Sequence, residues 1–365
     1  MPPDIPGDFN SYNKRVMIAP LNWGLGHVSR CIPIIHALEE MGVGILLASD
    51  GEALHLLKAE FPHLPSVRLP SYHIKYYGNN MVLNIARQLP RILYAKRAEK
   101  WHTEKLVRQY GIQGIISDNR YGCFHRSTSN VIMTHQLNLR IPQKSLEWMA
   151  NRALRISLAS FDEVWVPDTA SEPSLSGELS HPIDGLKNVH YIGLLSRAVH
   201  DTSEKEYDVA VVLSGPEPQR SNLEQMLLEQ AMALPQKFIF VQGKTKTKEH
   251  HFLADHLELV SYLTSEALNE VLCASDVIIC RSGYSSLMDL VVLGKPAVLI
   301  PTPGQTEQEY LAEECARRKW FQIQQQNNID LKVALTSAKP PIHLAELKKH
   351  INVFHPFLES WINKL

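Results

Sequence analysis

The sequence has little of what marks several common classes of protein. It contains five cysteines in 365 residues, and no two of them form a Cys-x-x-Cys pair. This scarcity excludes a disulfide framework and a cysteine zinc site, and it is typical of a reducing compartment. The formal net charge is −1. Such a balance argues against nucleic acid as a partner, because phosphate backbones select strongly basic surfaces.

Long apolar runs are also missing. No run approaches the ~20 residues needed to span a bilayer. The first thirteen residues are polar and rich in proline, without the basic start and apolar core of a signal peptide. We therefore expect a soluble protein of the cytoplasm, and its length suits two compact domains.

The chain alternates short apolar runs with amphipathic stretches. In the first half, strands are expected at 16–20, 43–49, 114–117, 131–134 and 163–167, with a helix at 28–41. In the second half, strands are expected at 208–215, 237–243, 257–263, 276–281 and 296–301, with helices at 221–234, 266–274, 285–293 and 308–320. Such alternation implies parallel sheets with helices on both faces. The predicted fold class is α/β, with two Rossmann-like domains facing each other across a cleft.

A polar segment at 196–207 separates the two series and is the best candidate for a linker. It gives an N-terminal domain at 1–195 and a C-terminal domain at 208–344. The last segment, 345–365, has the pattern of an amphipathic terminal helix.

A glycine-containing turn joins the first strand to the first helix. Gly24 and Gly26 allow a tight turn, and the N–H groups at a helix start can bind an anion. The dinucleotide fingerprint requires a third glycine where this chain has Ser29, which disfavours a hydride-transfer enzyme. His27 follows the turn, and a helix start disfavours the charged form of an imidazole, so His27 is a candidate catalytic base. The alternative is that His27 only caps the helix.

The stretch 280–310 carries the strongest functional signal. Arg281, Ser282 and Gly283 form a turn between a strand and a helix, and Ser285 lies in the first helical turn, which makes a second anion cradle. Asp289 lies about one and a half turns further on, where a carboxylate reaches a ribose diol. Gln308 and Glu309 open the next helix and are placed to bind sugar hydroxyls. The competing interpretation is that Gly283 is only a turn residue and Asp289 a solvated one.

These residues resemble glycosyltransferase family 28, in particular its lipid II-forming N-acetylglucosamine transferases. The family's Arg-Ser-Gly turn, its acidic residue six positions beyond the glycine and its Gly-x-Pro are matched by Arg281 to Gly283, Asp289 and Gly294 to Pro296. The family's Gln-Gln pair is matched by Gln308 and Glu309, and the departure at Glu309 leaves the transferred sugar open.

Other segments add to the resemblance. The family's Gly-rich loop ends in Gly-His, as here at Gly26 and His27. Ser214 and Gly215 are similar to the loop that faces the donor phosphates, and Leu263 lies where the family holds uracil through main-chain contacts. The stretch 134–138 is similar to a segment on the acceptor side.

The resemblance implies a GT-B fold and inverting transfer of a hexose or N-acetylhexosamine from a UDP-sugar. It implies no cofactor, and since no Asp-x-Asp follows a strand, we expect no bound metal. The terminal segment would pack back on the N-terminal domain, as is common in GT-B proteins. The resemblance assigns the donor contacts to Ser282, Gly283, Ser285, Asp289 and the Leu263 backbone.

Two other enzyme classes remain open. The segment 24–31 is also similar to the start of the hydrolase that removes UDP from a sugar nucleotide in pseudaminic acid synthesis. In that case water is the acceptor and His27 positions it. A UDP-sugar 2-epimerase is a third option, and a binding protein without catalysis is a fourth.

The stretch 72–108 is basic and interleaved with aromatic and aliphatic residues. Its cations are Lys75, Arg87, Arg91, Lys96, Arg97, Lys100, Lys105 and Arg108. Such a surface suits anionic lipid, and it would bring the enzyme to the inner face of the membrane, where a lipid-linked or cell-envelope acceptor lies. An ordinary solvated helix packed on the sheet explains the pattern equally well.

Overall fold

The computed structural model describes residues 9–72, 81–141, 143–183, 185–245 and 247–365. Internal contacts divide the chain into two compact units. The first comprises residues 1–23, 27–195 and 350–365, and the second comprises residues 24–26 and 196–349. Each unit contains one seven-stranded sheet, and the predicted class of two Rossmann-like α/β domains is confirmed.

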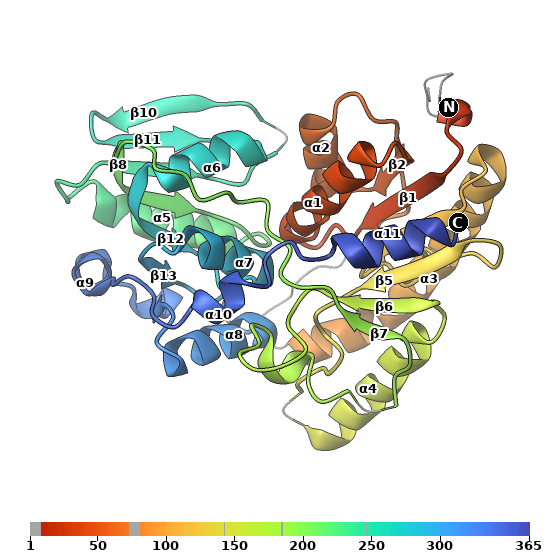
Figure 1. Ribbon diagram of the computed structural model, residues 1–365. Coiled ribbons are helices and arrows are strands. Elements are labelled where there is room, and N and C mark those ends of the chain that lie inside the picture. Colours follow the sequence, from red (N-terminus) through yellow and green to blue (C-terminus); the bar gives the residue numbers. More distant parts are fainter. Residues whose placement is uncertain (1–8, 73–80, 142, 184, 246) are drawn as a thin grey trace. The chain divides into compact units, whose positions relative to one another are not determined.

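The first unit is built on an all-parallel sheet in the order β3-β2-β1-β4-β5-β6-β7 (Figure 1). Its strands are β1 (Arg15–Pro20), β2 (Gly44–Ser49), β3 (Ser66–Arg68), β4 (Gly114–Asp118), β5 (Ser129–Met133), β6 (Glu163–Val166) and β7 (Val189–Tyr191). Its helices are η1 (Phe9–Ser11), α1 (Gly26–Glu40), α2 (Gly51–Glu60), α3 (Met81–Tyr110), α4 (Lys144–Leu158), η2 (Gly177–Leu179) and α11 (His355–Asn363). All residues of β2 and β4 are buried, as expected of parallel strands covered on both faces.

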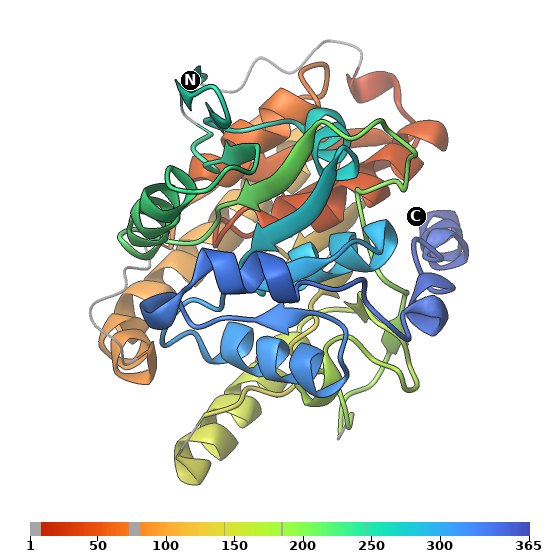
Figure 2. The same cartoon turned by 90° about the vertical axis from the view of Figure 1, so that its left-hand side faces the viewer.

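The second unit has the strand order β10-β11-β9-β8-β12-β13-β14. Its strands are β8 (Tyr207–Val212), β9 (Phe238–Val241), β10 (His250–Ala254), β11 (Leu257–Val260), β12 (Ser275–Cys280), β13 (Ala297–Leu299) and β14 (Gln322–Ile323). Its helices are α5 (Gln219–Ala231), α6 (Ser265–Cys273), α7 (Tyr284–Leu293), α8 (Thr306–Arg317), η3 (Gln326–Asn328), α9 (Leu331–Ser337) and α10 (Ala345–Lys348). Figure 2 shows helices lying against these strands.

Two strands of the second sheet, β10 and the two-residue β14, were not predicted. β10 pairs antiparallel with β11 at the sheet edge. Four of its five residues are exposed, so it lacks the buried apolar run by which the other strands are recognised. The remaining strand pairs of this sheet are parallel.

Both sheets have a topological switch point, where the chain leaves one side of the first strand and continues on the other. In the first sheet it lies between β1 and β4, and in the second between β8 and β12. Ligands of open α/β sheets bind outside the carboxyl ends of the strands at such points. The loops that follow these four strands are therefore the candidate ligand-binding loops.

The last 21 residues do not form the single helix that the sequence suggested. They form the short α10 and then α11, with a bridge and turn at 351–354 between them. Asn352 takes a left-handed conformation with φ 51°, and Pro356 stands in the first turn of α11, where a missing N–H is tolerated. The backbone therefore changes direction before α11 begins.

α11 completes the core of the first unit. Trp361 is fully buried, its Nε1 donates to Ser129 Oγ at 2.8 Å, and its ring meets that of Trp165 edge-on with centroids 5.9 Å apart. Leu194 bridges to Ile351 just before α11. Residues from the end of the chain are thus part of the same packed unit as β5 and β6.

Among the described residues, no helix combines the length and the apolar character that crossing a membrane requires. Two of the basic positions singled out above, Lys75 and the side chain of Arg87, lie outside the described residues. Of the others, Arg91, Arg97, Lys100, Lys105 and Arg108 are exposed on α3.

We expect Trp361→Ala to destabilise the first unit by about 3–5 kcal/mol, because it removes a buried aromatic ring and leaves Ser129 without its donor. Urea unfolding followed by tryptophan fluorescence and circular dichroism measures the change. Glu359→Ala, an exposed change on the same helix, is the control. A midpoint for Trp361→Ala equal to that of the control would mean that α11 is not part of the cooperative core.

Candidate active site at the switch points

In the first unit, a buried carboxylate stands at the switch point. Asp118 is the last residue of β4 and is fully buried. Arg30, also buried, donates from Nε to Asp118 Oδ2 at 2.6 Å, and its Nη2 donates to Oδ1. Burial by itself would raise the pKa of Asp118, but the charge of Arg30 and the hydrogen bonds from Arg30 and His27 outweigh it and lower this pKa to about 2. The carboxylate is therefore ionised at neutral pH.

His27 is the second residue of α1, in the position predicted from the sequence, and its side chain is 15% exposed. Its Nδ1 lies 3.0 Å from Asp118 Oδ1 and 3.0 Å from Arg30 Nη2. Because the ionised Asp118 carboxylate can only accept, we assign the proton of the neutral ring to Nδ1, which donates to Asp118 Oδ1. The contact with Arg30 Nη2 is then not a hydrogen bond, since both atoms are donors. This tautomer leaves Nε2 with the lone pair that a base needs.

A second histidine joins the same cluster. His135 Nδ1 accepts from Arg30 Nη1 at 2.9 Å, although 105 residues separate the two in sequence. His135 belongs to the 134–138 segment that the sequence places on the acceptor side, and it is 3% exposed. The structure thus brings that segment and His27 to two different nitrogens of one guanidinium group.

The loops around this cluster are fixed by a second buried arginine. Arg120 donates to Glu99 at 2.6 Å and to Asp50 at 2.9 Å. It also donates to the backbone carbonyls of Pro20 and Pro70. One side chain therefore ties the ends of β1 and β2 to α3 and to the segment after β3, which holds the carboxyl edge of the sheet in one arrangement.

Sequence reasoning missed Asp118, Arg30 and Arg120. The one sequence signal that could have identified Asp118 is its position directly after the predicted strand at 114–117. Arg30 and Asp118 are 88 residues apart, and no local sequence pattern indicates that they pair.

In the second unit, the predicted donor residues follow four parallel strands. Ser214 and Gly215 come after β8, Leu263 after β11, Arg281 to Gly283 after β12, and the loop before Gln308 and Glu309 after β13. Gly215 has φ 100°, a conformation that L side chains rarely adopt. Gly283 is the N-cap of α7, and Ser285 lies buried in its first turn. Because β8 and β12 flank the switch point, the Ser214 and Gly283 loops lie at one edge of the sheet.

Arg281 is almost completely buried, at 1% exposure. It donates to the carbonyl oxygens of Ile300 at 3.2 Å, Pro301 at 3.3 Å and Gln219 at 2.9 Å. Burial lowers the pKa of Arg281 to about 10, so it is still charged at neutral pH. Its hydrogen bonds tie the loops before α7, before α8 and at the start of α5 together.

Gln308 and Glu309 close the loop that follows β13. Gln308 Oε1 accepts from the Thr302 backbone at 2.9 Å, and Ser282 Oγ donates to the Gln308 carbonyl at 2.8 Å. Glu309 Oε1 accepts from the Gly304 backbone at 2.9 Å. Thr302 Oγ1 is buried without a hydrogen-bond partner among the described residues. The sequence did not single out this hydroxyl, and a side chain added at Gly215 would lie 3.7 Å from it.

Asp289 lies on α7 and is 9% exposed. Ser196 Oγ donates to its Oδ1 at 2.7 Å, and Arg197 Nε lies 3.6 Å from its Oδ2. Burial raises the pKa of Asp289, and the nearby Arg197 opposes that shift. The sequence placed Ser196 and Arg197 in a linker, but they hold this carboxylate.

The C-terminal domain of glycosyltransferase family 28 matches residues 210–346 of the chain. A UDP-N-acetylglucosamine transferase of Caldanaerobacter subterraneus, which acts on N-acetylmuramyl-(pentapeptide) pyrophosphoryl-undecaprenol, is 33% identical over 87 residues. That match spans 23% of this chain and 23% of the transferase. An uncharacterized glycosyltransferase of Methanopyrus kandleri is 24% identical over 299 residues, which cover 77% of this chain and 83% of that protein.

Solved structures extend the likeness to the whole fold. The calicheamicin glycosyltransferase CalG4 superposes with a TM-score of 0.62 at 12% identity, covering 96% of this chain and 99% of its own. At this identity the likeness concerns the fold alone. It includes both units, whereas the family match covers only the second.

We expect Asp118→Asn to flatten the acid dependence of stability. The folded-state pKa of about 2 lies below the ordinary value of ~3.9. The stabilisation by this carboxylate is therefore complete above about pH 4 and is lost as the pH falls towards 2. The shift corresponds to about 2 kcal/mol.

The measurement is the free energy of unfolding in urea, for parent and variant, from about pH 6 to about pH 2. The difference between the two should shrink by about 2 kcal/mol across that window. Asp255→Asn, at an exposed carboxylate, is the control. A constant difference for Asp118→Asn would contradict a lowered pKa.

Proposed function

We propose that this chain, a GT-B glycosyltransferase of the family 28 type, transfers a hexose or N-acetylhexosamine from a UDP-sugar with inversion and without a bound metal. The observation that carries the proposal is the convergence of polar loops at the switch point of the second unit, within the segment that matches the family. The name of the Caldanaerobacter relative, a UDP-N-acetylglucosamine transferase, supports uracil as the base of the donor.

The donor would lie across the ends of β8, β12 and β13. Backbone N–H groups at Gly283 and the first turn of α7 face the diphosphate, together with the hydroxyl of Ser214. Leu263 would hold uracil through its backbone, and Asp289 would accept from the ribose. Arg281 is too deeply buried to touch the donor, so its role is to fix the loops and supply positive charge beneath them.

Sugar recognition would fall to the loop after β13. Gln308 and Glu309 each use one oxygen to hold that loop, which leaves the Gln308 NH2 group and the second Glu309 oxygen for sugar hydroxyls. Thr302 Oγ1, a buried hydroxyl near Gly215, is a further candidate contact. A carboxylate at 309 accepts hydrogen bonds only, so it favours a hydroxyl donor on the sugar.

Transfer would begin at His27. Its Nε2 removes the proton of an acceptor hydroxyl while that oxygen attacks the anomeric carbon and the bond to the UDP oxygen breaks on the opposite face. Asp118 stabilises the imidazolium that forms, and loop N–H groups stabilise the leaving diphosphate. The products are the inverted glycoside, UDP and one proton held on His27.

The acceptor class follows from the relative rather than from the site. The Caldanaerobacter transferase acts on an undecaprenol-linked acceptor, and we propose a lipid-linked or cell-envelope acceptor here, met in the cytoplasm at the inner face of the membrane. The relatives described above are named transferases, and none of them favours the hydrolase or epimerase alternatives.

We expect His27→Ala to lower the rate of transfer by roughly 10²–10⁴-fold and to leave the affinity for UDP unchanged. The rate is measured as UDP release from a UDP-sugar with and without added acceptor, and the affinity by calorimetry. His36→Ala, an exposed histidine of the same helix, is the matched control. Full turnover by His27→Ala would remove His27 from the mechanism, whereas rapid stoichiometric UDP release without acceptor would make the protein a hydrolase.

We expect Asp289→Asn to weaken UDP binding by about tenfold, because a hydrogen bond to a charged acceptor is worth about 1.5–3 kcal/mol. Calorimetry with UDP measures the effect. Ser196→Ala removes the internal partner of the same carboxylate and should change the affinity much less. Equal affinities for Asp289→Asn and the parent would exclude the ribose contact.

A further inference from the structure

The first unit buries a carboxylate that the proposed mechanism does not use. Asp168 follows β6 and is 0% exposed. Its donors include three backbone N–H groups and two hydroxyl groups, which are provided by Thr169, Ser174, Leu175 and Ser176. None of these donors is a cation, so the hydrogen bonds themselves stabilise the buried charge. Because one carboxylate binds so many groups of the turn that follows it, it fixes the path of that turn.

A chain of hydroxyl groups continues from Asp168 as far as His181. Ser176 Oγ donates to Asp168 Oδ2, so it can only accept where it meets Ser180 Oγ at 2.5 Å. Ser180 therefore donates to Ser176, and we assign the proton of His181 to Nδ1, which lies 2.9 Å from Ser180 Oγ. The Gly177 carbonyl, which can only accept, lies 3.3 Å from the same nitrogen and requires the same proton. The carboxylate thus sets the direction of these bonds.

The same turn holds the acceptor-side segment at 134–138. Because β5 and β6 are neighbours in the sheet, the segments that follow them lie at one edge. The carbonyl of Leu179 accepts from the backbone N–H groups of Leu137 at 2.8 Å and Asn138 at 2.9 Å. The Asn138 side-chain amide donates to two further carbonyls of the turn, at 3.3 and 3.1 Å. Four hydrogen bonds therefore tie the segment to the turn.

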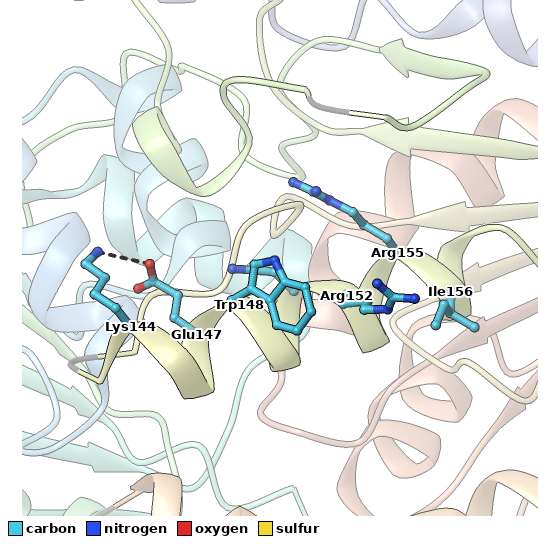
Figure 3. Close-up of a pocket in the computed structure, with 7 residues that line it drawn as sticks. Lys144, Glu147, Trp148, Arg152, Arg155 and Ile156 are labelled. Carbon is cyan, nitrogen blue, oxygen red and sulfur yellow. Dashed lines mark hydrogen bonds and ion pairs between the residues drawn. The ribbon is translucent and has the colours of Figure 1, made fainter.

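The residues that follow this segment are fastened to α4. Asn151 Nδ2 donates to the Leu139 carbonyl at 3.1 Å, and its Oδ1 accepts from the Leu139 N–H at 2.7 Å. Glu147, which Figure 3 shows near one end of α4, accepts from the Ile141 N–H at 3.0 Å. The path of the chain after β5 is thus fixed by α4 and by the turn after β6.

The 134–138 segment carries His135 to the reactive cluster. His135 Nδ1 accepts from Arg30 at 2.9 Å. Arg30 in turn binds Asp118, the carboxylate that orients His27. A displacement of the segment would therefore move a partner of the group on which the candidate base depends.

We propose that Asp168 is a positioning residue for the transfer reaction. It acts through the turn at 168–182, which sets the position of the 134–138 segment and so of the acceptor. A misplacement of about 1 Å, caused at a distance from the chemistry, can lower a rate by roughly 100-fold. The inference rests on the proposed function, since it assigns the 134–138 segment to the acceptor side.

The link between the turn and the segment is tested by amide hydrogen exchange on the whole chain. Asp168→Asn places an NH2 group opposite other donors and should release the turn, whereas Ser176→Ala removes one hydroxyl and is the milder change. In both variants we expect the Leu137 and Asn138 amides to exchange at least about fivefold faster, since each loses its bond to Leu179. Urea unfolding shows whether the variant still folds as a whole.

The role in transfer is tested by kinetics with each substrate varied separately. The probes are UDP-N-acetylglucosamine and a farnesyl pyrophosphoryl-N-acetylmuramyl pentapeptide, a short-chain form of the acceptor named for the Caldanaerobacter relative. We expect Ser176→Ala to raise the KM for the acceptor roughly tenfold, and Asp168→Asn to raise it further, with the KM for the UDP-sugar and the affinity for UDP unchanged. Partial unfolding would instead lower kcat and leave both KM values unchanged, because the remaining folded molecules bind normally.

Matched controls come from less buried positions of the same unit. Glu104→Gln changes a carboxylate that is 42% exposed, and Ser127→Ala removes an exposed hydroxyl. Neither should change the exchange of the 134–138 amides or either KM.

Unchanged exchange of the Leu137 and Asn138 amides in folded Ser176→Ala would overturn the inference. So would an unchanged KM for the acceptor in both variants, whatever the fall in kcat, since Asp168 would then only stabilise the fold. In these cases transfer by the parent leaves the proposed function intact. A parent that transfers no sugar to the probe would instead remove the proposed acceptor, and with it the role of Asp168 in transfer, while UDP binding still tests the donor site.

Discussion

The buried ion pair between Arg30 and Asp118 is the interaction on which the site of the first unit depends. Taking either charge out of water costs several kcal/mol, which only a close and well-bonded partner offsets. Here both carboxylate oxygens accept from one guanidinium. The pair links α1 to the end of β4 across the switch point, and His27 takes its orientation from the same carboxylate. Removing either charge would leave the other buried and unpaired, so the geometry at His27 is coupled to the stability of the unit.

The second unit also buries a charged side chain, but stabilises it without an ion pair. Arg281 is buried as a cation, and its bonds go to backbone carbonyls from three segments of the chain. Carbonyl dipoles stabilise the charge without cancelling it. A positive field therefore remains beneath the loops at the ends of β12 and β13. A diphosphate placed there would be favoured by this field as well as by the N–H groups of α7.

The sequence predicted most of the architecture because parallel strands are buried on both faces. The residues of β1, β2 and β12 form apolar runs that need no partner to be recognised. β10 has no such run and was missed, as were the short strands β3, β7 and β14. The terminal segment was predicted as one helix because its apolar period continues, whereas the turn depends on Asn352 in a left-handed conformation. Local patterns thus identify elements but not the places where the backbone turns.

The same distinction between local patterns and long-range contacts applies to the site residues. Arg281 to Gly283 and His27 were proposed from the sequence because turns beside helix starts have local signatures. Asp118 and Arg30 were not, since their pairing exists only after β1 and β4 are neighbours. The position of Asp289 on its helix was correctly predicted, but its bond to Ser196 connects residues 93 apart and had no signal. A single sequence therefore predicts where strand-to-helix turns lie better than it predicts which distant side chains support them.

α4 shows why the buried face of a helix is harder still to predict from a sequence. Its buried residues, Leu154 and Leu158, and its exposed residues, Trp148 and Ile156, are all apolar. A periodic pattern has no inward direction when both faces carry such side chains, so nothing was assigned to this segment from the sequence. Only the packed unit shows that the face with Leu154 and Leu158 is the buried one.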